Sequence, residues 1–178
     1  FHPMARGFDE FFGFLGHSHS YLDSEKASLN PIFDGRKVVV EIPYLTDLLT
    51  DRAVAFIKRQ KSQPFFLYLA FNAVHTPMEA TDKYLARFSY IEDKKRRTYA
   101  AMLSAMDDGI GNTLAALRSE GLEEDTLIFF LNDNGGPTMA GTTINGSSNA
   151  PLRGSKRQTL EGGIRVTFII RWKGHLAE

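Results

Sequence analysis

Two polar turns in the sequence carry side chains that could bind a cation or move a proton. Asp133 and Asn134 stand side by side before Gly135-Gly136, and hard cations such as Ca2+ and Mg2+ take carboxylate and amide oxygens as ligands. His75 follows an apolar run and precedes Thr76-Pro77, where its imidazole could donate a hydrogen bond or act as an acid or base. Taken alone, the first motif is also typical of an ordinary turn, and His75 of a histidine that caps a strand end.

A third segment, residues 151–166, is rich in glycine and in basic residues, which are Arg153, Lys156, Arg157 and Arg165. The whole chain has 21 Lys and Arg against 21 Asp and Glu, so it has no overall positive field for a nucleic-acid backbone or an anionic membrane. An anion site must therefore be local, and this segment can supply one. A solvated basic loop is the alternative interpretation.

The composition sets limits on the class of protein. With 178 residues, 43% hydrophobic and 24% charged, the chain is long and apolar enough for about one globular domain. It has no cysteine, which excludes disulfides, Cys-ligated zinc, Fe–S clusters and a thiol nucleophile within these residues. The longest apolar runs, such as 64–71, have the length of a strand and fall short of the ~20 residues of a membrane helix. We therefore expect no membrane span.

The elements that must position these side chains follow an α/β pattern. Apolar residues at helical spacing behind Thr46 or Asp47 predict a helix over roughly 47–60, and the continuous apolar run 64–71 predicts a strand buried on both faces. The same order repeats as a helix with apolar steps over 99–117 and a buried strand over 126–131. A third strand is predicted over 164–172. Helix, buried strand and polar loop in succession indicate an α/β fold.

The first part of the chain has a different pattern. Residues 1–34 are rich in Gly, His, Ser and aromatic residues without a helical period, which predicts an irregular loop. The Asp34-Gly35 dipeptide between apolar runs 31–33 and 37–42 predicts a small hairpin.

The sheet is expected to be largely parallel, with the strands near 65–70 and 127–131 adjacent or nearly so. Ligands of parallel α/β sheets bind outside the carboxyl ends of the strands. Since His75 and Asp133 each follow such an end, the pattern predicts that they meet at one site.

Several segments, in this order, resemble the sulfatase family of the alkaline-phosphatase superfamily. Arg6-Gly7-Phe8-Asp9-Glu10-Phe11-Phe12-Gly13-Phe14 is similar to the segment downstream of the family's Gly-Lys-Trp-His-Leu-Gly motif. Residues 64–77 resemble the family's strand and sulfate-facing histidine, and 133–136 its metal-binding turn. Residues 152–156 and 161–166 resemble its substrate-lysine segment. The resemblance covers essentially the whole chain and is more specific than any single motif.

The resemblance implies a fold and a set of roles. The fold would be the alkaline-phosphatase-like three-layer α/β fold with a largely parallel sheet, present as a partial domain. Asp133 and Asn134 would be ligands of Ca2+, or of Mg2+ as in some relatives. His75 and Lys156 would be the catalytic and substrate-binding residues that contact the sulfate ester.

The family's nucleophile is missing from these residues. In the family this nucleophile is a formylglycine made in a Cys/Ser-x-Pro-x-Arg motif, and the sequence lacks this motif. The sequence also lacks the early Asp pair that completes the family's metal site. Residues 1–178 would then be the central part of a catalytic domain, with the nucleophile segment upstream and a smaller subdomain downstream, and this fragment alone would be inactive.

The implied activity is that of a sulfatase, a sulfuric ester hydrolase similar to the arylsulfatases. Its substrate would be a sulfate-ester small molecule or a sulfated glycan, with no nucleic-acid partner, and its location periplasmic, secreted or lysosomal. Two alternatives stay open, a phosphodiesterase or phosphonate-ester hydrolase of the same superfamily, and a catalytically inactive truncated binding module.

Other polar residues carry weaker hypotheses. His17 and His19 are candidate residues of the substrate cleft. Asp107-Asp108 is interpreted as a solvated or helix-capping pair, because neighbours on a helix face different directions. Asn145-Gly146-Ser147 is an N-glycosylation sequon, which matters only in a secretory host.

Overall fold

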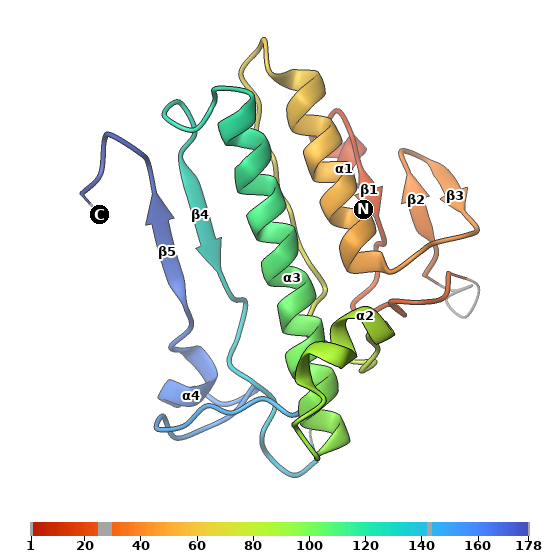
Figure 1. Cartoon of the computed structure of the whole chain (residues 1–178), viewed down its shortest axis with the longest axis vertical. Helices are drawn as coiled ribbons and strands as arrows, with labels where there is room; N and C mark the ends of the chain where they lie inside the picture. Colours follow the sequence, from red (N-terminus) through yellow and green to blue (C-terminus); the bar gives the residue numbers. More distant parts are fainter. Residues whose placement is uncertain (1, 25–29, 142–143, 178) are drawn as a thin grey trace.

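The computed structural model describes residues 2–24, 30–141 and 144–177. Helices α1 and α3 stand side by side, with a small sheet beside α1 and a strand pair beside α3 (Figure 1). The α/β class is confirmed. The elements are η1 (Pro3–Ala5), β1 (Phe12–Gly13), β2 (Ile32–Asp34), β3 (Lys37–Val39), α1 (Leu45–Gln60), α2 (Asp82–Leu85), η3 (Ala86–Phe88), α3 (Lys94–Ser119), β4 (Ile128–Leu131), α4 (Glu161–Ile164) and β5 (Phe168–Arg171).

The two long helices were predicted, but each begins earlier than expected. Helix α1 follows Tyr44, which makes no side-chain cap, so the predicted cap by Thr46 or Asp47 is wrong. Helix α3 begins at Lys94, and the Asp93 side chain accepts a hydrogen bond from the Arg96 amide over 2.6 Å. Its first turn is Lys94-Lys95-Arg96-Arg97. Because these residues are all cationic, the apolar period from which the helix was predicted starts only at Tyr99.

Close contact between α1 and α3 creates most of the core. Leu49, Ala53 and Ile57 of α1 are buried, as are Ala101 and Met102 of α3. Gly109 permits this approach, since a Cβ there would overlap Thr50 Oγ1 of the facing helix. Burying a large apolar side chain such as Leu49, Ile57 or Met102 stabilises the fold by about 1.5–3 kcal/mol.

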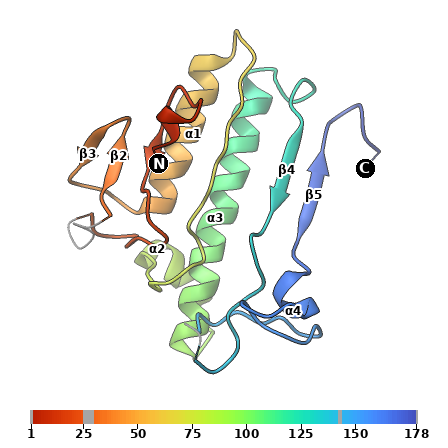
Figure 2. The ribbon, with the colours of Figure 1, turned by 180° about the vertical axis from the view of Figure 1, so that it is seen from behind.

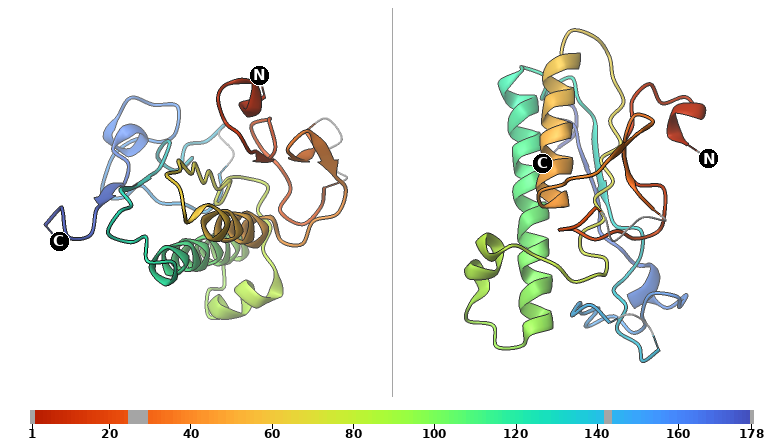
Figure 3. Two further views of the ribbon diagram at one scale, coloured as in Figure 1. Left: turned by 90° about the horizontal axis from the view of Figure 1, so that it is seen from above. Right: turned by 90° about the vertical axis from the view of Figure 1, so that its right-hand side faces the viewer.

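The apolar run 64–71 is extended, but the prediction that it is buried on both faces is wrong. Phe65 and Leu67 pack against the helices, whereas Phe66 and Tyr68 are 75% and 71% exposed. No strand ladder joins this run within the described residues. It runs along α3 (Figure 2), so that the helices form one layer and the extended segments a second (Figure 3). The expected third layer is not found among the described residues.

Strand pairing also differs from the expectation. Strands β4 and β5 pair in an antiparallel ladder, with Phe129 opposite Ile170. A parallel pair needs a crossover that carries the chain back to the start of the strand, usually a helix. The segment between β4 and β5 is instead glycine-rich, and in its described residues, 132–141 and 144–167, the four-residue helix α4 is the only helix or strand. Residue 164, the expected start of the third strand, belongs to α4, and these described residues stay at one end of the molecule (Figure 1). The chain therefore returns along β5 in the opposite direction.

The direction of the extended segments nevertheless agrees with the prediction. The run 64–71 and β4 point the same way in Figures 1 and 2. Their carboxyl ends consequently lie at the same end of the molecule, where His75 and Asp133 follow them.

The predicted hairpin is confirmed. Strands β2 and β3 pair antiparallel around the turn that contains Gly35, whose φ is +60°. Strand β1 adds to this hairpin, so the prediction of an irregular loop over 1–34 is only partly correct. Residues 1 and 25–29 of that loop lie outside the described residues. No helix in the described part of the chain is both long and apolar enough to cross a membrane.

A buried carboxylate attaches β5 to the loop before β4. The Glu123 side chain is 8% exposed and contacts Arg171 over 2.7 Å and Lys173 over 2.9 Å. Hydrogen bonds from Lys173 and Arg171 lower the pKa of Glu123 from 4.5 to about 2. The folded protein therefore holds this carboxylate ionised at pH values where the unfolded chain already takes up a proton.

Because the pKa of Glu123 is depressed, its contribution to stability should be complete above about pH 4.5 and lost as the pH falls toward about 2. We expect the free energy of unfolding of Glu123→Gln to fall less over this pH range than that of wild type. Urea unfolding of the full-length protein at several pH values measures it. Identical pH profiles for wild type and variant would contradict the assignment.

Candidate functional site

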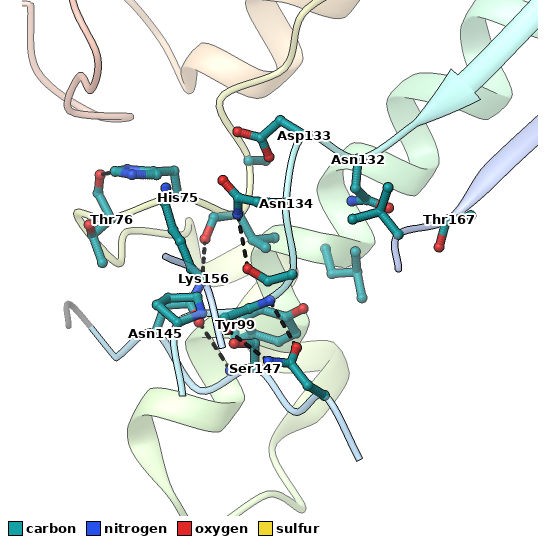
Figure 4. A pocket seen from close by; sticks show the side chains of 18 of the residues that line it. His75, Thr76, Tyr99, Asn132, Asp133, Asn134, Asn145, Ser147, Lys156 and Thr167 are labelled. Atoms are coloured by element: carbon teal, nitrogen blue, oxygen red, sulfur yellow. Dashed lines mark hydrogen bonds between the residues drawn. The ribbon is translucent and has the colours of Figure 1, made fainter. Parts of the chain in front are cut away.

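One cavity of about 970 Å3 lies beyond the carboxyl ends of the run 64–71 and of β4. His75, Asp133, Asn134 and Lys156 all line it, and their side chains surround one part of the cavity in Figure 4. The structure thus brings together the four residues that the sequence singled out, although they come from three separate segments.

The Asp133-Asn134 turn presents two oxygen donors. The Asn134 Nδ2 group donates to Gly135 O over 2.9 Å, which leaves Oδ1 for a ligand. Asp133 is exposed and has no ion pair within the described residues. Gly135 is required for close packing, because a Cβ there would overlap Gly162 O of helix α4. The turn is therefore packed against α4.

This donor chemistry fits a hard cation such as Ca2+ or Mg2+, which bind carboxylate and amide oxygens. No group of three or more His, Asp or Glu suited to a metal is found in the described residues. Ca2+ takes about six to eight oxygen ligands. Asp133 and Asn134 can thus supply only part of a coordination sphere.

The backbone carbonyl of the next residue, Thr76, sets the tautomer of His75. Its Nδ1 atom lies 2.7 Å from Thr76 O, and a carbonyl can only accept, so Nδ1 carries the proton. This leaves Nε2 as the ring nitrogen for a ligand or a proton. Such an arrangement suits an imidazole that contacts an anion or a leaving group.

Tyr21 holds the turn that carries His75. The ring is fully buried, and its hydroxyl lies 2.6 Å from Asn72 O and 2.9 Å from His75 O. Burial, with nearby Tyr44 and Glu79, raises the pKa of the Tyr21 hydroxyl. Tyr21 therefore stays protonated and donates to this turn at all physiological pH values.

Backbone and side-chain hydrogen bonds connect the loop of Lys156 to the residues that follow the Asp133-Asn134 turn. The Lys156 amide donates to Gly136 O over 3.1 Å. The buried Ser155 hydroxyl accepts from the amides of Thr138 and Met139 over 2.9 and 3.2 Å. Lys156 and the Asp133-Asn134 turn consequently form one rigid unit.

Asn149 completes this unit. Its Oδ1 accepts from the Gly136 amide over 2.8 Å, and its Nδ2 donates to Gly136 O over 2.9 Å and to Gly154 O over 3.0 Å. One amide side chain thus links the turn after Asp133 with the loop before Lys156. No sequence motif marks this role, because the backbone partners lie 5 and 13 residues away and Asn is common in loops.

We expect Asn149→Ala to lower the free energy of unfolding by about 2–3 kcal/mol, because three hydrogen bonds of about 1 kcal/mol each are lost. Urea unfolding of the full-length protein measures this change. Asn112→Ala, at an exposed position of α3, is the control and should stay within about 0.5 kcal/mol of wild type. Equal effects of the two substitutions would contradict the linking role of Asn149.

The structure also shows where the other candidate residues lie. His17 lines the cavity. His19 is buried, its ring centroid lies 5.2 Å from that of Phe14, and its Nδ1 contacts Ser20 O. His19 is therefore a buried polar residue and does not line this cavity. Asp107 is exposed. Asp108 makes two hydrogen bonds with Arg87, of 3.0 and 2.7 Å, and its side chain is 37% exposed, so it is a partly solvated, ion-paired residue and not a helix cap.

The sequon residue Asn145 is also structural. It is only 5% exposed, and its Nδ2 donates to Val74 O over 2.9 Å. Glycosylation attaches the sugar to this nitrogen, so the folded chain does not present it. Asn145 instead supports the same turn that Tyr21 holds.

Comparison with known proteins places these residues in context. The family model described as Sulfatase matches residues 2–178. Arylsulfatase J of Mus musculus is 37% identical over 177 residues, which are 94% of this chain and 29% of that protein. N-acetylgalactosamine-6-sulfatase of Homo sapiens is 32% identical over 189 residues, covering 99% of this chain and 35% of that protein. The chain spans about a third of the length of these relatives.

Solved structures give the same likeness. The crystal structure of Ps i-CgsB superposes with a TM-score of 0.90 at 38% identity, covering 98% of this chain and 42% of that one. The same protein in complex with k-i-k-neocarrahexaose gives a TM-score of 0.89. The fold of the described residues is thus that of a part of these proteins.

Proposed function

Because the chain belongs to the sulfatase family, we propose that the full-length protein is a metal-dependent sulfatase that hydrolyses a sulfate ester in the cavity at His75, Asp133, Asn134 and Lys156. The observation that carries the proposal is that these four residues, from three segments, line one cavity. It is supported by the family match over nearly the whole chain.

Lys156 and His75 would bind the anion. The transition state of sulfate-ester hydrolysis spreads negative charge over the sulfate oxygens and the leaving oxygen. A lysine ammonium held in a fixed loop stabilises such charge without reorganising. The Nε2 atom of His75, with its tautomer set by Thr76 O, would contact the sulfate or pass a proton to the leaving oxygen.

Asp133 and Asn134 would hold Ca2+ or Mg2+. When bound, the ion supplies Lewis-acid stabilisation of the sulfate charge. The remaining ligands would come from outside the described residues, which hold no further acidic or histidine cluster. The nucleophile, a formylglycine, would likewise come from outside this sequence, which lacks both cysteine and a Ser-x-Pro-x-Arg motif.

Family membership also supports a periplasmic, secreted or lysosomal location and a sulfated small molecule or glycan as substrate. The oligosaccharide ligand of Ps i-CgsB, k-i-k-neocarrahexaose, supports a glycan as the natural substrate.

Hydrolysis of 4-nitrophenyl sulfate and of bis(4-nitrophenyl) phosphate by the full-length protein tests the proposed activity. We expect kcat/KM to be at least ~100-fold higher for the sulfate, which corresponds to about 2.7 kcal/mol of selectivity. Faster hydrolysis of the phosphodiester would support the phosphodiesterase alternative, and hydrolysis of neither ester would favour a binding module.

A further inference from the structure

The cavity carries more positive charge than one sulfate ester needs. Its wall includes Lys156, Arg157 and Arg165 but a single carboxylate, Asp133, in a chain that is neutral overall. Arg165 has an ionic partner, Glu161, at 3.4 Å. Lys156 and Arg157 make no side-chain hydrogen bond or ion pair within residues 2–24, 30–141 and 144–177. Two cations are thus available to an incoming ligand.

The backbone at Arg157 is in a conformation that arginine rarely adopts. Its φ is +76°, and it is the only residue other than glycine with a positive φ in the described chain. A left-handed conformation is unfavourable for a residue with a Cβ, whereas glycine adopts it freely. Arginine at this position therefore destabilises the fold relative to glycine. A function of its charged side chain would explain why an arginine is present.

The turn that holds Arg157 is rigid. The Gln158 amide donates to Ser155 O over 3.0 Å and closes the turn. Ser155 is 2% exposed and is anchored to the backbone of 138–139. Strained positions of this kind cluster at functional sites, where the surrounding structure enforces them. The turn presents Arg157 next to Lys156 at the cavity.

Resting on the proposed function, we infer that Arg157 is a specificity-determining residue that binds a second anionic group of the substrate. The substrate class is then an anionic glycan with a sulfate or carboxylate close to the ester that is cleaved. Lys156 and His75 are the residues proposed above to contact the reacting sulfate, so Arg157 has no part in that contact. The planar guanidinium of Arg157 can bind a separate sulfate or carboxylate through two parallel hydrogen bonds.

The test compares Arg157→Asn and Arg157→Lys in the full-length protein. Asn tolerates the left-handed conformation and removes the charge, while Lys keeps the charge and loses the paired donors. The substrates are an aryl monosulfate, an oligosaccharide with two neighbouring sulfates, and one with a sulfate beside a carboxylate. Arg36→Asn, the same change in the exposed hairpin turn, is the matched control.

We expect Arg157→Asn to lower kcat/KM for one of the doubly anionic substrates by ~10- to 100-fold, mainly through KM, because a charge-assisted contact is lost. The loss on the aryl monosulfate should be at least ~10-fold smaller. Arg157→Lys should lie between wild type and Arg157→Asn. Arg36→Asn should leave all three substrates unaffected. The substrate with the larger loss identifies the second anion as sulfate or carboxylate.

Equal losses on all three substrates, or none, would overturn the inference while leaving the sulfatase activity established. Calorimetric titration of the same oligosaccharides gives a readout that does not depend on turnover. If wild type hydrolysed no sulfate ester but bound the doubly anionic oligosaccharides ~10-fold more tightly than Arg157→Asn, the proposed activity would fail and the role of Arg157 would stand. Equal affinities would overturn that role.

Discussion

Asp133→Ala in the full-length protein is expected to lower kcat/KM for a sulfate ester by about a thousandfold or more. Asp133 carries the only charged oxygen donor of the Asp133-Asn134 turn, so its loss should remove the metal ion. A catalytic metal ion stabilises transition-state charge by several kcal/mol. Steady-state kinetics with an aryl sulfate in the presence of Ca2+ measures the effect.

Asp108→Ala is the control for this prediction. Asp108 is a carboxylate on the surface of α3 that pairs with Arg87. It does not line the cavity and has no proposed role in catalysis. Its loss should change kcat/KM less than about threefold. Similar effects of the two substitutions would show that Asp133 does not act as a metal ligand.

Lys156→Ala is expected to cost about 2–4 kcal/mol of transition-state stabilisation, or roughly thirty- to a thousandfold in kcat/KM. The ammonium lines the cavity and has no side-chain hydrogen bond or ion pair among the described residues, so its charge is available to the sulfate. The measurement is again steady-state hydrolysis of an aryl monosulfate.

Lys37→Ala makes the matched control, because Lys37 is an exposed lysine of β3. It should leave kcat/KM unchanged. If Lys156→Ala lowered kcat/KM only a few-fold, segment 151–166 would be a solvated basic loop without a specific role, and the role assigned to Lys156 would be wrong.

Local patterns were enough to predict the main elements. The apolar spacing of α1 and α3 reflects their buried faces, and Asp34-Gly35 reflects the positive φ that the hairpin turn requires. These features depend on residues close in sequence, which is why they could be predicted from it.

Features that depend on distant partners could not be predicted in the same way. An apolar run such as 64–71 does not show whether its second face is covered, and Phe66 and Tyr68 prove to be exposed. The direction of β5 depends on the path of the glycine-rich segment before it. A continuous apolar pattern fits either outcome.

The candidate site shows the same division. His75, Asp133, Asn134 and Lys156 were found because their residue types carry chemistry and their segments resemble a family. Tyr21 and Asn149 were missed, because they act through hydrogen bonds to backbone groups, which lie 51 and 54 residues away for Tyr21 and 5 and 13 residues away for Asn149. Nothing in their sequence neighbourhood distinguishes them from ordinary loop residues.

The most direct test of the proposed site is a crystal structure of the full-length protein soaked with Ca2+ and inorganic sulfate. We predict a Ca2+ ion with oxygens of Asp133 and Asn134 at about 2.3–2.6 Å. A sulfate should lie within about 2.7–3.2 Å of Lys156 Nζ and His75 Nε2. Ca2+ bound away from Asp133, or a sulfate that contacts neither Lys156 nor His75, would contradict the assignment of this cavity as the sulfatase site.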